Sequence, residues 1–367
     1  MSRDLFAGVM SGTSLDGIDA VLADFGAGAE VCAVAAATHV DFPAELRREL
    51  FALQASGPDE IVRAARVANR LADLYAHALR SVCLAAGVEA HEVVAAGVHG
   101  QTVRHRPHEG WTTQINSPAR VAELAYMTVV ADFRMRDIAA GGQGAPLVPA
   151  FHAAMFRVPG RHRVIANLGG IANITDLPPR GDVRGFDTGP ANVLLDLWHS
   201  RHLGRPYDEA GRFAASGTVS EALLAGLLAE PYLALPPPKS TGRDLFNAAW
   251  LERALARVDA TPADVQATLA AFTARTLAHA IRTHCEGATD LFVCGGGAYN
   301  ADLLRRIRVE LPEMPVATTD AVGVASGHVE ALAFAWLARE AIAGRSGNLP
   351  AVTGAAGPRV LGAIYPR

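Results

Sequence analysis

The residues most suited to chemistry lie in one short loop, residues 8–19, with the sequence Gly-Val-Met-Ser-Gly-Thr-Ser-Leu-Asp-Gly-Ile-Asp. Its glycines let the backbone turn tightly and present N–H groups to an anion, and its hydroxyls add further donors. These residues are Gly8, Gly12 and Gly17 with Ser11, Thr13 and Ser14. Asp16 and Asp19 could hold a hydrated Mg²⁺, which would offset their repulsion of phosphate. The loop predicts a polyphosphate site, and the alternative is a serine- and glycine-rich turn without a ligand.

The apolar runs on either side indicate which kind of phosphate loop this is. Residues 5–9 before it and 20–25 after it have the length of strands, so the loop is expected to close a hairpin. A Walker loop would open a helix and carry a lysine, but the only lysine in the chain is Lys239. No Gly-x-Gly-x-x-Gly motif follows a strand, which removes the strongest sign of a dinucleotide-binding fold.

Polar side chains also follow two later strands, predicted at residues 93–98 and 127–131. Open α/β sheets bind ligands at the carboxyl ends of their strands, so these side chains are candidate substrate contacts. They are His99, Gln101, Thr102, Asp132 and Arg134. His99, His105 and His108 do not have the spacing of a metal site, and we expect only one of them to face a substrate.

The glycine pattern recurs in the second half of the chain. Residues 163–175 again have the pattern strand, glycine turn, strand, and residues 185–192 then open a helix. Residues 291–294 form another strand, which runs into three glycines and a helix and could seat the adenosine side of a nucleotide. Asp187, just before a helix, is either its N-cap or a catalytic carboxylate.

Composition limits the class of protein. A chain of 367 residues that is 50% apolar and 19% charged is long enough for two globular domains. A net charge of −4 gives no sign of a nucleic-acid or membrane surface. The four cysteines are widely spaced, which favours reduced thiols over disulfides or zinc. Without a signal peptide or a long apolar run, we expect a soluble cytoplasmic protein.

Residues 138–148 are rich in glycine and alanine and have the composition of a passage between two lobes. The predicted lobes are residues 1–138 and 139–367, and the C-terminal segment is a candidate to rejoin the first lobe. An amphipathic pattern predicts a long helix that Pro58 opens and Gly87 ends. A final helix over residues 329–343 and a closing strand over 360–364 complete the prediction.

Seven motifs, in order along nearly the whole chain, resemble the anhydro-N-acetylmuramic acid kinase family of the actin/Hsp70/sugar kinase superfamily. They lie at residues 8–19, 99–105, 132–149, 167–175, 186–190, 239–243 and 294–298. The resemblance implies an α/β fold with two ribonuclease-H-like lobes and a central interlobe nucleotide cleft. It also implies ATP and Mg²⁺ as cofactors, a small anhydro amino sugar as the partner molecule, and a homodimer without nucleic-acid or membrane partners.

The activity that this resemblance implies has two parts. The family opens the 1,6-anhydro ring of 1,6-anhydro-N-acetylmuramic acid with water and phosphorylates O6 from ATP. The products are N-acetylmuramic acid 6-phosphate and ADP, in peptidoglycan recycling and amino-sugar catabolism. Asp187 matches the catalytic base, which would take a proton from the attacking water.

The remaining site residues are carried over by position in the motifs. Contacts to ATP fall on Gly12, Thr13, Ser14, Leu15, Asp16, Gly17, Ile18, Asp19, Gly170, Asn173, Gly295, Gly296 and Gly297. Contacts to the sugar fall on His99, Gln101, Thr102, Asp132, Arg134 and Glu330. Arg134 would pair with the lactyl carboxylate, because a guanidinium group fits a carboxylate in a bidentate manner. Asp16 and Asp19 would hold Mg²⁺ through water.

Some positions depart from the family pattern. Ala191 replaces a usual glycine, Tyr299 an often-found histidine, and Ser326-Gly-His328 an expected Pro-Asp-Trp-like approach to Glu330. We expect these changes to alter affinity more than the type of reaction.

Lys239 is either solvated or reaches the phosphates. The competing functions are a nucleotide-gated switch of the actin or Hsp70 kind and another small-molecule kinase of the superfamily.

Overall fold

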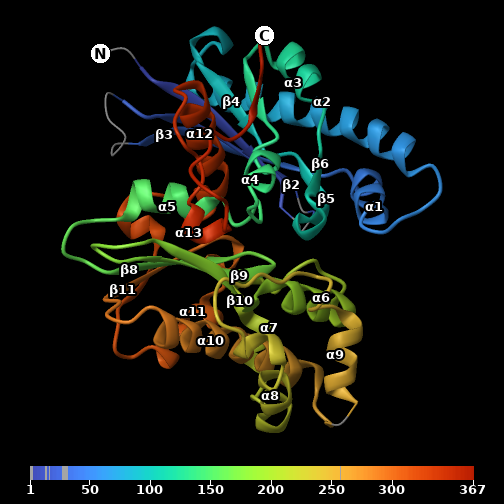
Figure 1. The fold of residues 1–367 in the computed structure, drawn as a ribbon. Helices are drawn as coiled ribbons and strands as arrows, with labels where there is room; N and C mark the ends of the chain where they lie inside the picture. Colours follow the sequence, from blue (N-terminus) through green and yellow to red (C-terminus); the bar gives the residue numbers. More distant parts are fainter. Residues whose placement is uncertain (1–2, 13–14, 16, 27–31, 257) are drawn as a thin grey trace. The chain divides into compact units, whose positions relative to one another are not determined.

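The computed structural model describes every residue except 1–2, 13–14, 16, 27–31 and 257 (Figure 1). The chain forms two compact units. Unit 1 comprises Met1–Met155 with His328–Arg367, and unit 2 comprises Phe156–Gly327. Residues 139–155 therefore belong with unit 1, seventeen residues past the boundary that composition suggested. Buried Asp137 explains this, because its carboxylate accepts hydrogen bonds from Gly144, Asn348 and Thr353 and so ties both segments to the first unit.

Unit 1 is built on a six-stranded sheet with the order β13-β7-β4-β1-β2-β3. The first three strands run antiparallel in succession, β4 lies parallel to β1, and β7 lies parallel to β4. The strands are β1 (Leu5–Met10), β2 (Gly17–Asp24), β3 (Ala33–Asp41), β4 (Ala95–Val98), β7 (Val129–Ala131) and β13 (Ala363–Tyr365). A separate hairpin of β5 (Gln101–Arg106) and β6 (Trp111–Ile115) follows β4.

Two long helices cover the faces of this sheet. Alternate residues of β1, such as Leu5 and Val9, pack in one core with the apolar stripe of α2 (Glu60–Ala86). The opposite face carries α12 (Val329–Ile342), whose backbone approaches the strands at two glycines. A Cβ on Gly8 would lie 1.9 Å from the Ala331 carbonyl oxygen. One on Gly97 would lie 2.0 Å from the Phe334 carbonyl oxygen. Both glycines are therefore required for helix packing.

Short helices complete unit 1. They are α1 (Ala44–Ala52), α3 (Pro118–Ala125), α4 (Met135–Ala139), α5 (Val148–Phe156) and α13 (Pro350–Thr353). The predicted long helix is confirmed, and Gly87 ends it in the left-handed conformation with a φ of 65°. The predicted last helix corresponds to α12, and the predicted closing strand is the short β13.

Unit 2 repeats the topology of the first sheet, with the order β10-β9-β8-β11-β12. Again three successive antiparallel strands are followed by two parallel ones. The strands are β8 (Arg163–Leu168), β9 (Ile171–Leu177), β10 (Arg184–Pro190), β11 (Asp290–Cys294) and β12 (Val316–Thr318). The helices are α6 (Asn192–Leu203), α7 (Arg212–Ser216), α8 (Glu221–Leu228), α9 (Ala248–Leu255), α10 (Pro262–His284) and α11 (Ala301–Glu310).

Both sheets place their first five strands in the spatial order third, second, first, fourth, fifth. This is the ribonuclease-H-like arrangement, so the predicted α/β fold with two such lobes is confirmed. The interlobe nucleotide cleft stays a prediction.

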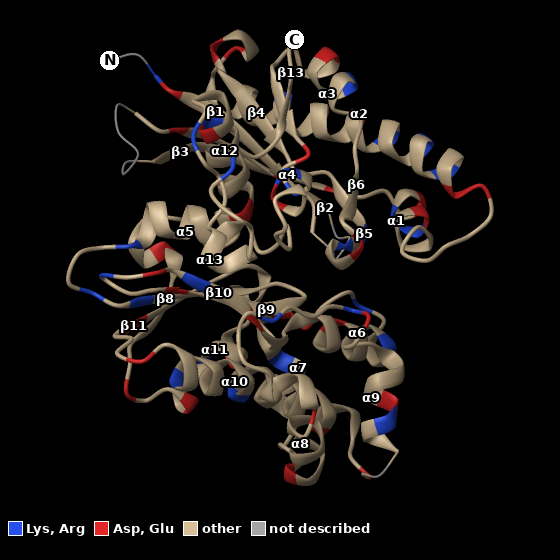
Figure 2. Ribbon diagram, in the orientation of Figure 1, with Lys and Arg blue, Asp and Glu red and all other residues tan. Residues whose placement is uncertain are grey.

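Acidic and basic residues are interspersed along both units (Figure 2), in line with the small net charge. Among the described residues, no helix has the length and apolar composition needed to cross a membrane.

Candidate active site

The predicted phosphate loop connects β1 and β2, which pair as an antiparallel hairpin with Met10 opposite Asp19. The predicted hairpin is therefore confirmed. Thr13, Ser14 and Asp16 lie outside the described residues. Leu15 is buried and donates its N–H to the carbonyl of Gly12 over 3.3 Å.

Several loop side chains point into unit 1. The Ser11 hydroxyl forms a 2.8 Å hydrogen bond with the hydroxyl of Tyr75 from α2, and the side chain of Ile18 is fully buried. A Cβ on Gly17 would lie 2.6 Å from the Val40 carbonyl oxygen, so glycine allows close pairing with β3. Any contact of Leu15, Gly17 or Ile18 with a nucleotide would thus use the backbone.

Asp19, a predicted magnesium contact, lies in a short row of titratable side chains. Its Oδ1 lies 2.7 Å from Nδ1 of His39, and Nε2 of His39 lies 3.4 Å from Oδ1 of Asp41. Asp19 and His39 are about half exposed. No group of three or more metal-ligating side chains occurs in the part of the chain that the structure describes. Mg²⁺ bound through water and phosphate needs only one or two carboxylates, so the predicted magnesium contact stays a prediction.

His99 and Arg134 lie together in unit 1. Nε and Nη2 of Arg134 donate to Nε2 of His99 over 3.1 and 2.9 Å, and Nη1 donates to the Gly144 carbonyl over 2.7 Å. Because arginine can only donate, Nε2 of His99 must be unprotonated. Burial holds the pKa of His99 well below its usual value, and the positive charge of Arg134 lowers it further. A hydrogen bond with the Gly100 backbone acts in the opposite direction but is outweighed. His99 is therefore a neutral group that orients Arg134.

Arg134 keeps its charge although it is enclosed. Burial lowers the pKa of its guanidinium to about 10, and the charges of Glu330 and Asp137 act in the opposite direction. Three of its five N–H groups are used by His99 and Gly144, and these two residues leave the other two N–H groups unused. Asp137 in turn accepts the Gly144 N–H over 2.8 Å. This buried carboxylate, for which the sequence suggested no role, therefore fixes the loop that holds Arg134.

The other predicted sugar contacts have different surroundings. Gln101 is fully buried and its Nε2 donates to the Gly12 carbonyl over 3.2 Å, which joins the start of β5 to the phosphate loop. Oγ1 of Thr102 accepts from Gln114 within the β5–β6 hairpin. Asp132 has a φ of 59° and accepts the Met135 N–H. Partial burial raises its pKa against this hydrogen bond. Gln101 thus contacts the phosphate loop, and Arg134 contacts His99 and the Gly144 carbonyl. Thr102 and Asp132 instead make hydrogen bonds with neighbouring residues of their own segments.

The glycine turn of unit 2, between β8 and β9, is fastened to the start of α6. The carbonyl of Gly170 accepts the N–H groups of Ala191 and Val193 over 2.9 and 3.0 Å, and that of Gly169 accepts the Asn192 N–H over 3.0 Å. These hydrogen bonds fix the turn relative to the end of β10. Asn173, the second predicted contact here, lies opposite Asp187 in the β9–β10 register.

Asp187 lies on β10, the edge strand of the second sheet, where a register shift follows it before Gly189. Its N–H donates to the Lys239 carbonyl over 3.2 Å, its carbonyl accepts from the Tyr232 hydroxyl over 2.9 Å, and its Oδ2 accepts the Thr241 N–H over 2.9 Å. Oδ1 receives no hydrogen bond from any described residue. The N-cap alternative is wrong, because Ala191 is the N-cap of α6.

The environment of Asp187 suits a general base. Burial raises the pKa of its carboxyl to about 7, while the Thr241 N–H and the charge of Lys239 act to lower it. A carboxylate whose pKa lies near the working pH can accept a proton and release it again. Asp187 therefore presents one open oxygen with the basicity that proton transfer at neutral pH requires.

The side chain of Lys239 points toward residues that shortly precede it in the chain. Its Nζ donates to the Leu233 carbonyl over 2.9 Å and lies 5.0 Å from the centre of the Tyr232 ring. Burial lowers the pKa of this lysine, and the charge of Asp187 opposes that change. Sequence reasoning gave Lys239 no contact with Asp187 and missed Tyr232 and Thr241. The Lys-Ser-Thr-Gly-Arg motif was the available signal for Thr241, and Tyr232 had none.

The three glycines after β11 differ in their surroundings. A Cβ on Gly295 would lie 2.3 Å from Oδ1 of Asn167, and one on Gly297 would lie 2.5 Å from Cβ of Leu168. Only Gly296 among the three has room for a side chain, since its nearest neighbour would be 3.6 Å away. The glycines therefore let this turn pack against the end of β8. Gly296 and Gly297 are themselves part of a 3₁₀ turn, Gly296–Tyr299, and α11 then begins at Ala301.

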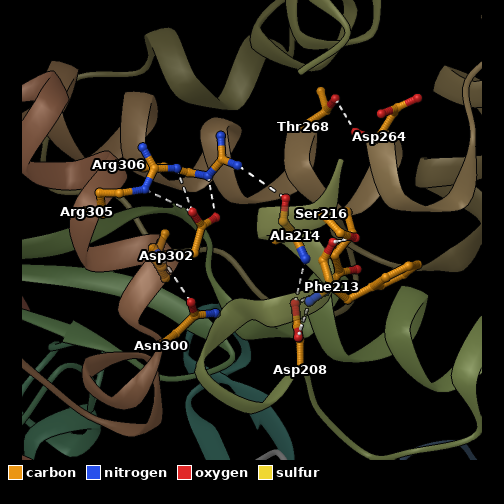
Figure 3. Close-up of polar contacts among 12 residues, drawn as sticks. Asp208, Phe213, Ala214, Ser216, Asp264, Thr268, Asn300, Asp302, Arg305 and Arg306 are labelled. Atoms are coloured by element: carbon orange, nitrogen blue, oxygen red, sulfur yellow. Dashed lines mark hydrogen bonds and ion pairs between the residues drawn. The ribbon is translucent and has the colours of Figure 1, made fainter. Parts of the chain in front are cut away.

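A segment that the sequence did not single out supports the start of α11 (Figure 3). Asp208 accepts the N–H groups of Phe213 and Ala214 over 2.9 Å each. Asp302 pairs with Arg306 over 2.6 Å, and Arg306 donates to the Ala214 carbonyl over 3.4 Å. Residues 208–214 are therefore tied to the helix that follows the glycine turn.

The fold and these residues define a class of enzyme. Two ribonuclease-H-like sheets, each with a glycine-rich turn after its first strand, have the architecture of the actin/Hsp70/sugar kinase superfamily, and the buried aspartate of the second sheet suits an enzyme of this class. The particular family follows from comparison with known sequences. A model of the anhydro-N-acetylmuramic acid kinase family matches residues 4–367. The chain belongs to this family, and the resemblance seen in the motifs is confirmed.

Curated relatives agree along the whole length. The anhydro-N-acetylmuramic acid kinase of Burkholderia cenocepacia is 56% identical over 99% of this chain and 96% of its own. That of Thiobacillus denitrificans is 54% identical over 98% and 97%. Among solved structures, a ROK family glucokinase from Streptomyces griseus in complex with glucose and AMPPNP covers 92% of this chain and 99% of its own, at 17% identity and a TM-score of 0.43. That likeness is distant, and the strand order supports the fold class without it.

Proposed function

We propose that this protein uses ATP and water to convert 1,6-anhydro-N-acetylmuramic acid into N-acetylmuramic acid 6-phosphate and ADP. The observation that carries the proposal is Asp187, a held carboxylate with one open oxygen and a pKa raised to about 7. Such a group can activate the water that opens the anhydro ring. In this role the enzyme serves peptidoglycan recycling.

The proposed reaction joins hydrolysis to phosphoryl transfer. Oδ1 of Asp187 takes a proton from water as the water oxygen bonds to C1 of the sugar. The bond between C1 and O6 breaks, and O6 takes its electron pair and bonds to the γ-phosphorus of ATP as ADP leaves. Because phosphorus captures the departing oxygen, no separate general acid is required.

The nucleotide is proposed to use the backbone of the first hairpin and the glycine turns of unit 2. The contacts are Gly12–Asp19, Gly170 with Asn173, and Gly295–Gly297. Asp19 and Asp16 are proposed to hold Mg²⁺ through water, where the ion supplies positive charge that neutralises the phosphates. The two remaining N–H groups of Arg134 suit the lactyl carboxylate, with His99, Gln101, Thr102, Asp132 and Glu330 as further sugar contacts.

An isotope experiment tests the proposed reaction. The protein is incubated with ATP and the anhydro sugar in oxygen-18 water, and the products are analysed by mass spectrometry. We expect label at C1, phosphate on O6 and one ADP per sugar consumed. ADP release without sugar conversion would indicate a nucleotide-gated ATPase. Phosphorylation without label at C1 would indicate an ordinary sugar kinase, and either result would overturn the proposal.

A further inference from the structure

We infer that the segment 231–241 is a positioning element for Asp187, in which Tyr232 and Lys239 fix the backbone that aims the open carboxylate oxygen at water. This inference rests on the proposed role of Asp187 as the general base. Neither residue needs to touch the sugar or the nucleotide for this role. Their effect on the reaction passes through Asp187.

The hydrogen bonds of Asp187 support the inference. The backbone of an edge strand has N–H and carbonyl groups that no neighbouring strand pairs. At Asp187 both groups are taken by this one segment, through the Lys239 carbonyl and the Tyr232 hydroxyl. The N–H of Thr241 also takes Oδ2. Three of the four polar groups of Asp187 are thus fixed, which leaves Oδ1 as the oxygen for proton transfer.

Lys239 connects the two ends of the segment 231–241. Its Nζ donates to the Leu233 carbonyl over 2.9 Å, while its own carbonyl accepts the Asp187 N–H. The same ammonium lies 5.0 Å from the centre of the Tyr232 ring. The lysine side chain therefore joins both ends of the segment, and its loss would loosen the two backbone groups that hold Asp187.

Lys239 also has an electrostatic effect on Asp187. The charged or titratable groups that face this carboxyl are the Lys239 ammonium, which favours its ionised form, and the Tyr232 phenol, which stays neutral because burial raises its pKa. Behind them, His284 at the end of α10 packs on Phe186 and has its pKa lowered by burial and by nearby cations, Lys239 first. Removal of the ammonium is therefore expected to raise the pKa of Asp187.

Four proteins test the inference: the parent, Tyr232→Phe, Lys239→Met and Lys239→Arg. For Lys239→Met the acid limb of kcat/KM for the sugar should move up by roughly half to one pH unit, and Lys239→Arg should reverse most of that shift. For Tyr232→Phe, kcat should fall roughly tenfold with the acid limb in place, because only orientation is changed. Nucleotide Kd, measured by calorimetry, should stay within about twofold of the parent in all three variants.

A second measurement does not depend on turnover. The ¹³C carboxyl resonance of Asp187, assigned with Asp187→Asn, is titrated in the parent and in Lys239→Met. A higher midpoint in Lys239→Met supports the inference even if the parent does not convert the anhydro sugar, in which case only the proposed function fails. Equal midpoints in folded variants, or parent kinetics in both Tyr232→Phe and Lys239→Met, would overturn the inference whatever the substrate.

Discussion

Asp187 shows how an aspartate in a strand can have the basicity that proton transfer at neutral pH requires, a task that histidine often performs. Its backbone is held on both sides and one of its two carboxylate oxygens is taken, so little freedom remains. Burial destabilises its charged form more than Thr241 and Lys239 stabilise it. The result is a pKa near 7 on a group whose direction is fixed, and both properties can be tested with one substitution.

Asp187→Asn should abolish most turnover and leave nucleotide binding intact. The asparagine oxygen can still accept the Thr241 N–H, so the geometry is kept, but the amide cannot take a proton from water. We expect kcat to fall by at least about 10² in a coupled ADP assay. Asp182→Asn, an exposed carboxylate on the approach to β10, is the matched control and should retain parent activity. A kcat for Asp187→Asn within threefold of the parent would contradict the assignment.

The same substitution should stabilise the protein in a pH-dependent way. A folded-state pKa of about 7 lies above the ordinary value of 3.8, so the parent loses stability as the pH rises between these values. Asparagine has no such loss. The Tm of Asp187→Asn should therefore exceed that of the parent by roughly 5 °C at pH 8, with the difference vanishing near pH 4. Differential scanning calorimetry across this range measures the effect, and a constant difference would refute the raised pKa.

At the scale of elements, glycine positions set how closely helices and strands approach. The sequence indicated glycines for an anion site, and Gly12 and Gly17 do lie at the predicted hairpin loop. Gly8 instead lies within β1 against α12. This contact could not be predicted, because its partner Ala331 is more than three hundred positions away in the sequence. Local pattern specifies a turn, whereas packing between distant segments depends on the tertiary fold.

Adding a methyl group at Gly8 or Gly97 should destabilise unit 1. The new carbon would meet a backbone oxygen of α12 at 1.9 or 2.0 Å, which forces the helix away from the sheet. We expect Gly8→Ala and Gly97→Ala each to lower the free energy of unfolding by about 3 kcal/mol, as judged by urea denaturation. Gly226→Ala in α8 has open space and should be neutral or slightly stabilising. Equal stability of all three variants would contradict this account of the glycines.

The loop held by Asp137 should control sugar affinity through Arg134. In Asp137→Asn, an amide group replaces one of the acceptors of Gly144, Asn348 and Thr353, so the Gly144 carbonyl loses its fixed place. The KM for the anhydro sugar should rise roughly tenfold. The Kd for ATP, measured by calorimetry, should change little. An unchanged KM in a folded variant, with Glu123→Gln at an exposed position of α3 as a surface control, would show that the loop does not position Arg134.

At the scale of the whole molecule, the chain uses one topology twice. The strand, glycine turn, strand pattern predicted the first hairpin of each sheet, and the family resemblance predicted the two lobes, whereas β3 and β12 were not predicted. The unit boundary was harder to predict. Composition placed it in the glycine-rich stretch after residue 138, but hydrogen bonds of Asp137 keep that stretch in unit 1. Tyr232 was missed because its hydroxyl acts on a backbone carbonyl, which leaves no sequence pattern.

The family resemblance predicts a homodimer, and two-fold closed assemblies are the commonest oligomers. Size-exclusion chromatography with light scattering should give twice the chain mass of 38.5 kDa at micromolar concentration. Dilution and a second concentration serve as controls for weak association. A mass equal to that of one chain at every concentration would show a monomer.

Unit 2 occupies one continuous stretch of the chain, whereas unit 1 needs the last forty residues to supply the helix that covers Gly8 and Gly97. Synthesis runs from the N-terminus, so all of unit 2 is synthesised before that helix. The half that is synthesised first must then wait with one apolar sheet face uncovered. The N-terminal unit is therefore the last of the two to be completed, although its synthesis begins first.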